Sequence, residues 1–443
     1  MLRSMRMKNF KSWADTGDIR LAPITGFYGA NSSGKTSLLQ MLLLMKQTST
    51  LNDPQTDLYL GNADSLVNLG TFHSIAHKHD VNVEVEFALT WDEEYLAYYY
   101  VLDGEEDKEV AQNIFAEGRL SFTCQFLETD GQIVADWFEY ATGEDYARVE
   151  RHDYDGDVSR SMTTRGKFSE FHFSIDHGRT PDYWQAAVEI DLTRPSSEYV
   201  HLRTFLRDQL AQTVYLGPLR ATPQRVYVWG GDKPSDVGKT GERMISALLS
   251  EQAQGKSGLE QKVAEWLKKM GLIHSFSLRP LAPGRRDYEI VVKKTPDSAE
   301  VLITDIGFGV SQLLPVLVLC YYVPEGSTLI LEQPEIHLHP SVQADLADVF
   351  IDVIKTRKLQ IIFESHSEYL LHRLQRRIAE EVLDQDDTAL YFCEVQGEES
   401  KLKPLELDEY GNIANWPKDF FGDTTGDLVA MTQAEMRRRM ANP

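Results

Sequence analysis

The chain of 443 residues is 42% hydrophobic and 26% charged, which is ordinary for a globular protein, and its length predicts two to four units or one elaborated α/β domain. The net charge of −23 argues against a surface that coats nucleic acid, because such a surface is basic, although a local basic groove stays open. No apolar run approaches the ~18 residues needed to span a bilayer, so no membrane partner is expected.

The first part of the chain predicts strand, strand, loop and helix within residues 1–50. Its opening sequence, MLRSMRMKNFKSW, is basic but lacks the apolar core and cleavage site of a secretory signal. Leu and Met recur at helical spacing in residues 35–47, and residues 81–91 alternate with period two, as a half-buried strand does. The three cysteines of the chain are widely spaced and lack metal-ligand spacing, so we expect a reduced, cytoplasmic protein.

The middle and the end of the chain differ in pattern. Residues 92–210 are rich in aromatic and acidic residues between turn sequences, and we interpret them as an antiparallel β insert or second lobe without a catalytic group. Strands and helices alternate over residues 211–387, which favours a sheet with parallel strands, and residues 310–323 predict a helix despite Pro315. Residues 388–443 predict a β segment and a basic terminal helix.

The sequence GANSSGKT, residues 29–36, fits the phosphate-binding pattern GxxxxGK[ST] without a mismatch. Its glycines let the backbone wrap so that amide groups point at phosphate oxygens. Lys35 adds a positive charge at the β- and γ-phosphates, and Thr36 can offer its hydroxyl to Mg²⁺. We therefore expect ATP to be bound by Gly29, Ala30, Asn31, Ser32, Ser33, Gly34, Lys35, Thr36 and Ser37.

Three later segments add chemistry to this loop. The apolar strand in STLILEQPE delivers Glu332 to the carboxyl edge of the sheet, where open α/β sheets bind ligands. A second apolar strand, LQIIF, places His366 where it can reach a γ-phosphate, and the glycine-rich turn in DIGFGVSQLLP precedes a helix whose N-terminus can bind an anion. Each has a plain alternative, namely a surface acid, a structural histidine and an ordinary turn, but the phosphate loop favours the functional interpretation.

Taken in order, these four segments resemble ABC-type ATPases of the SMC/RecF/OLD class, in which phosphate loop, signature turn, Walker B strand and switch histidine follow in this sequence. MKNFKSW also resembles the opening strand of that class. More narrowly, YLGPLRATPQR, DIGFGVSQLLP, LEQPEIHLHPSVQADLAD and ESHSEYLLHRLQRRI are similar to compact bacterial AAA ATPases of anti-phage defence operons, related to the ATPase subunits of Septu, PARIS and Gabija. The likeness covers residues 1–90 and 210–440.

The resemblance implies a fold: an α/β ABC-type ATPase head with a mixed or parallel central sheet, flanking helices and an antiparallel β lobe. Residues 1–91 and 211–387 would be the two parts of the ATPase domain, 92–210 the β-rich insert and 388–443 an extension. It also implies Mg²⁺-dependent ATP hydrolysis, with Mg²⁺ held by Thr36 and Glu332. The expected assembly is a homodimer around two ATP molecules, with a higher oligomer left open.

The resemblance assigns roles and exposes departures from the family pattern. Gly309 matches the signature glycine that caps the γ-phosphate of the opposite subunit, while Gly307 stands at the signature serine, so that either Ser311 replaces it or the contact is absent. Glu332 stands for the usual aspartate, and Gln333 for the usual catalytic glutamate. An amide is no useful base, so we expect slow turnover, with Glu335 supporting the residual chemistry beside His366; Glu335 as a turn cap is the alternative.

The leading functional hypothesis is a dimerising ATPase switch, read by an effector or nuclease supplied in trans. The alternative is a DNA-repair or chromosome-type SMC/RecF-like ATPase that contacts DNA directly, which the acidic balance and the lack of long heptad repeats weaken. A transporter subunit ranks lower, because GFGVSQ lacks the LSGGQ composition. A nuclease within the chain is disfavoured, because only about 50 residues follow Leu390.

Overall fold

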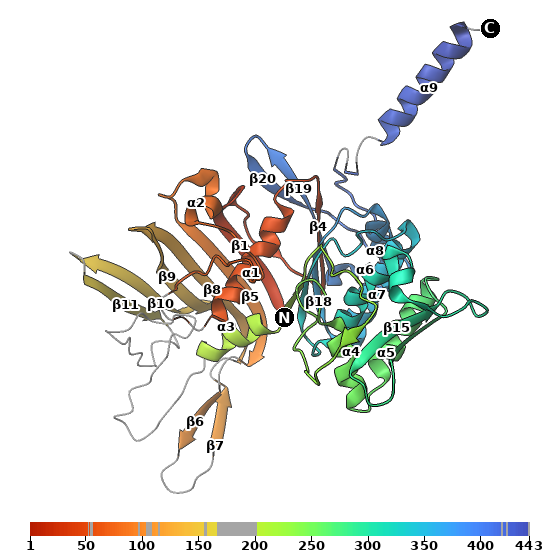
Figure 1. Ribbon diagram of the computed structural model, residues 1–443. Coiled ribbons are helices and arrows are strands. Elements are labelled where there is room, and N and C mark those ends of the chain that lie inside the picture. Colours follow the sequence, from red (N-terminus) through yellow and green to blue (C-terminus); the bar gives the residue numbers. More distant parts are fainter. Residues whose placement is uncertain are drawn as a thin grey trace.

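The computed structural model of the protein contains two large β-sheets with helices packed around the second (Figure 1). It describes the whole chain except residues 52, 54–55, 96–97, 103–108, 114–115, 155–156, 166–201, 418–419, 422–423 and 442–443. Residues 166–201 of the predicted insert therefore lie outside the described residues.

The first sheet is eight-stranded and antiparallel, in the order β11-β10-β9-β8-β5-β1-β2, with β3 also paired to β1. Its strands are β1 (Leu2–Phe10), β2 (Trp13–Asp15), β3 (Ile19–Arg20), β5 (Val85–Tyr95), β8 (Ala116–Thr129), β9 (Gln132–Thr142), β10 (Asp145–Tyr154) and β11 (Asp157–Arg165). The antiparallel strands predicted after residue 92 are confirmed as β8 to β11, and they continue the sheet that begins at the N-terminus. A separate hairpin pairs β6 (Tyr98–Leu102) with β7 (Glu109–Asn113).

The second sheet is six-stranded, in the order β12-β17-β18-β4-β19-β20, and only β20 runs antiparallel to its neighbour. Its strands are β4 (Ile24–Gly29), β12 (Thr213–Leu216), β17 (Thr328–Glu332), β18 (Gln360–Glu364), β19 (Thr388–Gln396) and β20 (Glu399–Pro404). The apolar runs in β17 and β18 suit a parallel sheet that is covered on both faces. This sheet confirms the predicted α/β fold with a mixed central sheet.

Alternate residues of the second sheet enter two different cores. Ile361 and Phe363 of β18 pack in the core formed with the later helices, whereas Ile362 packs in the core shared with the first sheet. Helix α1 lies between the two sheets, and α4 to α8 cover the opposite face. The helices are α1 (Lys35–Ser49), α2 (Phe72–Ile75), α3 (Leu202–Ala211), α4 (Met244–Ala253), α5 (Gly258–Lys269), α6 (Phe308–Tyr322), α7 (Pro340–Arg357), α8 (Glu368–Ala379) and α9 (Thr424–Ala441).

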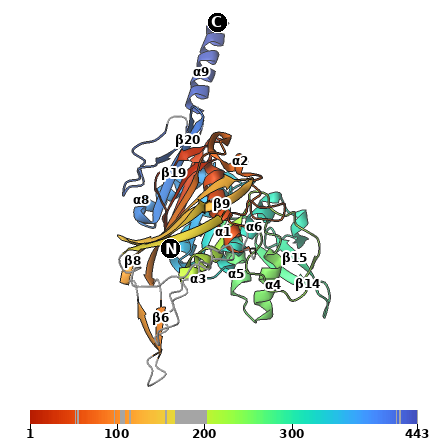
Figure 2. The ribbon, with the colours of Figure 1, turned by 90° about the vertical axis from the view of Figure 1, so that its left-hand side faces the viewer.

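Smaller features complete the fold. A four-stranded sheet of β13 (Tyr227–Val228), β14 (Ser275–Pro280), β15 (Asp287–Lys293) and β16 (Val301–Leu302) flanks the later helices. The helix expected at 310–323 is confirmed as α6, which continues through Pro315. Helix α9 projects from the body, opposite the β6–β7 hairpin, in both views (Figure 2). Within the described residues, no helix is both long and apolar enough to cross a membrane.

Candidate active site

The phosphate loop connects β4 to α1 and is held in a tight path by two glycines. Gly29 has φ +139 and Gly34 has φ +92, a region of backbone conformation that favours glycine. A Cβ on Gly29 would lie 2.2 Å from the Cys393 carbonyl oxygen, so a side chain there is also excluded by space. The Lys35 ammonium donates to the carbonyl oxygens of Gly29 and Ala30, at 3.1 and 2.7 Å, and therefore lies inside the loop where phosphate oxygens would enter.

The N-terminal motif MKNFKSW supports this loop from outside. The Trp13 indole nitrogen donates to the Gly34 carbonyl oxygen at 3.1 Å, and Trp13 itself is fully buried. Strand β20 lies on the same side, since a Cβ on Gly34 would come within 2.5 Å of the Ser400 hydroxyl. The N-terminal motif therefore does more than build the first sheet, because Trp13 at the start of β2 fixes one end of the phosphate loop.

Two buried carboxylates face each other at the carboxyl ends of neighbouring strands. Glu332 ends β17, Glu364 ends β18, and the two are paired in the strand register. They are only 6% and 3% exposed. The Thr36 hydroxyl donates to Glu364 at 2.7 Å, and the Tyr215 hydroxyl donates to Glu332 at 2.9 Å. The sheet thus joins the phosphate loop to both acids.

The electrostatics of the Glu332–Glu364 pair favour a bound cation. Burial and the nearby charge of Glu364 raise the pKa of Glu332 to about 7, and burial also raises the pKa of Glu364. Two buried carboxylates that repel each other are stabilised when a cation is shared between them. Mg²⁺ in nucleotide sites is bound through one or two carboxylates and phosphate oxygens, so Thr36, Glu332 and Glu364 fit it. Mg²⁺ there would neutralise charge on the phosphates.

The loop after β17 is strained and anchored. Gln333 has φ 43, which is uncommon for a residue with a side chain, and its N–H donates to the Glu364 carbonyl oxygen at 3.0 Å. Glu335 is buried and accepts hydrogen bonds from the Ser365 hydroxyl at 2.7 Å and the His366 N–H at 2.8 Å. We expected Glu335 to be able to swing towards an attacking water, and such a movement would have to break both of these bonds. Glu335 holds the histidine loop in place as the site stands.

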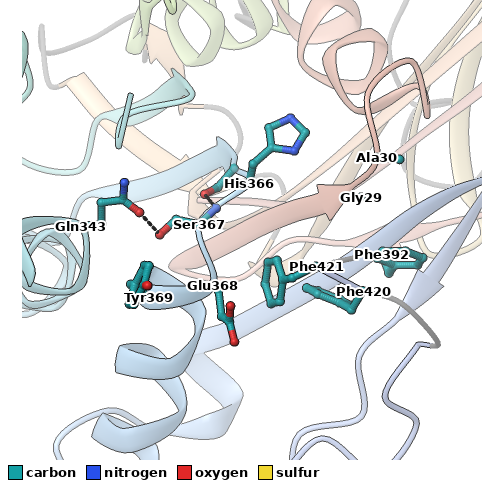
Figure 3. A pocket seen from close by; sticks show the side chains of 11 residues that line it. Gly29, Ala30, Gln343, His366, Ser367, Glu368, Tyr369, Phe392, Phe420 and Phe421 are labelled. Atoms are coloured by element: carbon teal, nitrogen blue, oxygen red, sulfur yellow. Dashed lines mark hydrogen bonds between the residues drawn. The ribbon is translucent and has the colours of Figure 1, made fainter. Parts of the chain in front are cut away.

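His366 lies at the mouth of a hollow of about 510 Å³ beside the phosphate loop. Phe392, Phe420 and Phe421 gather on one side of this hollow, and Gln343 and Ser367 lie on the other (Figure 3). Partial burial and the charge of Lys35 lower the pKa of His366, which favours the neutral imidazole, in which one ring nitrogen donates a hydrogen bond and the other accepts one. His366 thus lines the same hollow as Gly29 and Ala30 of the phosphate loop, and its contact with a γ-phosphate stays a prediction.

The glycine-rich turn caps a different element. Gly307 is the N-cap residue of α6 and is exposed, and a Cβ on it would meet no atom of the described residues within 4 Å. Gly309 lies in the first turn of α6, beside the backbone of His337. Ser311, which either replaces the signature serine or leaves that contact absent, is only 3% exposed. Another molecule can therefore reach Gly307, which is exposed, and Gly309, which is half-buried, but not Ser311.

Sequence reasoning missed three residues of the site: Tyr215, Arg220 and Glu364. Glu364 carried a signal, because it ends an apolar strand in the same way as Glu332 does. Tyr215 lies in β12, and Arg220 lies in the loop that follows this strand. Both come close to Glu332 because β12 pairs with β17, and only the sheet order reveals this pairing.

Comparison with known proteins places the chain in a family. It matches the model described as AAA ATPase domain over residues 1–189 and 235–371, and a model described as a protein of unknown function (DUF3696) over residues 383–431. No curated protein matches it significantly.

Several solved SMC heads are similar to the chain at low identity. A head bound to the C-winged helix domain of ScpA is 13% identical, covers 92% of this chain and 98% of its own, and has a TM-score of 0.45. The head from Thermotoga maritima is 11% identical, with coverages of 91% and 99% and a TM-score of 0.39. The Pyrococcus furiosus head bound to a ScpA domain is 11% identical, with coverages of 92% and 96% and a TM-score of 0.43. TM-scores this low support no inference about fold or function. The AAA ATPase domain model, however, spans more than half of the chain, so the expected ATPase assignment is confirmed: this protein is an ATPase that belongs to the AAA ATPase domain family.

Proposed function

We propose that the protein is a Mg²⁺-dependent ATPase that closes as a homodimer around ATP and acts as a slow switch for a partner effector in bacterial anti-phage defence. One observation carries the catalytic part: the phosphate loop, the Glu332–Glu364 pair and His366 meet at one edge of one sheet. A triphosphate held by the loop would place its γ-phosphate beside the acids and the imidazole. Positioning and electrostatic stabilisation of this kind supply most of the catalysis in phosphoryl transfer.

Slow turnover follows from the groups around that phosphate. Gln333 occupies the position of the usual base and cannot take a proton, although its amide can orient a water molecule. Glu332 and Glu364 would be engaged with Mg²⁺, and Glu335 accepts two hydrogen bonds from the histidine loop. An ATP-bound state that lasts long suits a sensor better than a motor.

The dimer is supported by the turn before α6. Gly307 and Gly309 lie at the start of a helix of 15 residues, whose N-terminal N–H groups carry partial positive charge. These groups suit the γ-phosphate of an ATP molecule that is bound to a second copy of the chain. Gly307 and Gly309 have no side chains, which permits close approach at these two positions. A higher oligomer stays open within this proposal.

Gly309→Asp tests the dimer directly, because a carboxylate in the first turn of α6 would repel a phosphate. We expect the variant to keep wild-type ATP affinity as a monomer but to lose ATP-dependent dimerisation and turnover, measured by light scattering after size exclusion and by phosphate release. The matched control is Gly258→Asp, at the exposed start of α5. A variant that dimerises and turns over like the control would remove the signature turn from the assembly.

The defence role rests on the resemblance of the YLGPLR, DIGFG, LEQPEIHLHP and ESHSEYLL segments to ATPases of such systems, and it requires an effector or nuclease in trans. Cells that carry the operon, meaning the genes of this protein and of its partner effector, should resist phage in a plaque assay. Lys35→Ala should remove this resistance. Equal plaque numbers with and without the operon would contradict the role. Tight, salt-sensitive binding of duplex DNA by the chain alone would instead favour the DNA-repair alternative.

A further inference from the structure

Arg220 is a buried cation whose donors are all unused. It follows β12 at the carboxyl end of the second sheet and is only 8% exposed. Its three guanidinium nitrogens, Nε, Nη1 and Nη2, are each buried without a hydrogen-bond partner in the part of the chain that the structure describes. A buried charge without a partner is strongly destabilising, so a guanidinium in this position needs an explanation.

The surroundings of Arg220 are those of the ATPase site. Burial lowers the pKa of Arg220 to about 10, while the charges of Tyr215, Glu332 and Glu335 act in the opposite direction, so the side chain is a cation at neutral pH. Glu332 accepts from Tyr215, and one carboxylate oxygen of Glu335 accepts from Ser365 and His366. The other oxygen of Glu335 is buried without a hydrogen-bond partner among the described residues, as the Arg220 nitrogens are. The guanidinium therefore lies next to the acid pair without bonding to it.

The sheet order defines where Arg220 lies relative to the acid pair and the phosphate loop. Strands β12, β17, β18 and β4 are consecutive neighbours, so Arg220 is at one end of the row, the two acids are between, and the phosphate loop is at the other end. The charge of Glu335 acts to raise the pKa of both Lys35 and Arg220, which places the two cations on the same stretch of the sheet edge.

We propose that Arg220 binds the terminal phosphate of ATP held in this site, and thereby distinguishes ATP from ADP. This inference rests on the proposed ATPase site. A guanidinium has no hydrogen-bond acceptor and cannot bind Mg²⁺. Its planar set of N–H donors matches the oxygens of a phosphate. A phosphate that reached past the acid pair would satisfy two or three donors that are otherwise orphaned. ADP lacks the phosphate that extends so far.

The experiment compares Mg²⁺-bound nucleotide affinities, by isothermal titration calorimetry, for the wild type, Arg220→Met and Arg220→Lys, using a non-hydrolysable ATP analogue and ADP. For Arg220→Met we expect at least a tenfold loss of affinity for the ATP analogue and less than a twofold change for ADP. Arg220→Lys keeps the charge but not the planar fork, and should fall between. Arg286→Ala removes an exposed arginine elsewhere and should match the wild type.

Thermal unfolding without nucleotide supplies a second readout. Arg220→Met removes a buried charge that has no bonded partner, so its unfolding temperature should equal or exceed that of the wild type. A lowered unfolding temperature, or a variant that does not fold, would mean that Arg220 is a structural group and would overturn the inference.

The remaining outcomes separate this inference from the ATPase proposal. If Lys35→Ala abolishes binding of both nucleotides while Arg220→Met binds both like the wild type, the site stands and the role of Arg220 falls. An equal loss of ATP and ADP affinity in Arg220→Met would also overturn it. If the wild type binds neither nucleotide, the ATPase site and this inference fail together.

Discussion

Glu364→Gln tests the pair of acids formed by Glu332 and Glu364, which no sequence motif predicted as a pair. The substitution keeps the size of the side chain and leaves an amide oxygen for the Thr36 hydroxyl, which donates to Glu364 at 2.7 Å. It removes one of the two negative charges at the ends of β17 and β18. The variant should therefore fold normally, because the charge that it removes is buried and is repelled by Glu332.

The magnitude follows from the hydrogen bond and the charge. A hydrogen bond to a charged group is worth about 1.5–3 kcal/mol, and its neutral replacement about 1 kcal/mol. The loss of one carboxylate next to Mg²⁺ adds to this, and changes of groups around a metal typically cost about 10–100-fold in affinity or activity. We expect the Mg²⁺ concentration for half-maximal ATP turnover to rise 10- to 100-fold, which corresponds to roughly 1.4–2.8 kcal/mol.

The assay is phosphate release at saturating ATP over a range of Mg²⁺ concentrations. ATP binding without Mg²⁺ should be unchanged or slightly tighter, since a negative charge near the phosphates is removed. Glu398→Gln, at an exposed turn, is the matched control. A Mg²⁺ requirement in Glu364→Gln equal to that of the control would refute the reasoning and leave Glu364 as a partner of Thr36 alone.

Two further predictions concern the histidine loop and the packing of α7 on α8. We expect Glu335→Gln to slow single-turnover hydrolysis at least tenfold, about 1.4 kcal/mol of barrier, without weaker ATP binding; an unchanged rate would remove Glu335 from the mechanism. Asp348 accepts hydrogen bonds from Arg377 at 2.6 and 2.9 Å and from Arg373 at 2.5 Å. Burial raises the pKa of Asp348, but these arginines outweigh it and hold the pKa below its ordinary value. Asp348→Asn should therefore lower the free energy of unfolding by about 1–3 kcal/mol at pH 7, and in urea titrations this difference should shrink as pH falls below about 4; a difference that grows in acid would contradict the assignment.

The phosphate loop could be predicted because its chemistry is contiguous in sequence. Gly29, Gly34, Lys35 and Thr36 act within eight residues, and the spacing alone specifies a turn that presents backbone N–H groups to an anion. Glu332 was found for a related reason, since an apolar strand that ends in an acid places that acid at the sheet edge. The alternation of strands and helices likewise predicted the α/β sheet, because each element carries its own period.

The rest of the site depends on strand order, which the sequence does not carry. Arg220 and Tyr215 belong to the neighbourhood of Glu332 only because β12 pairs with β17, more than a hundred residues later in the chain. The anchoring of Glu335 was missed because it requires the loop after β18 to lie against the loop after β17. The continuity of β8 to β11 with the N-terminal strand is a long-range pairing of the same kind.

The central claim is that this sheet edge hydrolyses ATP slowly with Mg²⁺, and the most direct test is steady-state phosphate release by the wild type and Lys35→Ala. Lys35 contributes the ammonium inside the loop, and its removal leaves the loop glycines and the sheet intact. We predict slow release by the wild type that stops when Mg²⁺ is chelated, and none by Lys35→Ala, whose circular dichroism should match the wild type. Equal release by both proteins would contradict the account.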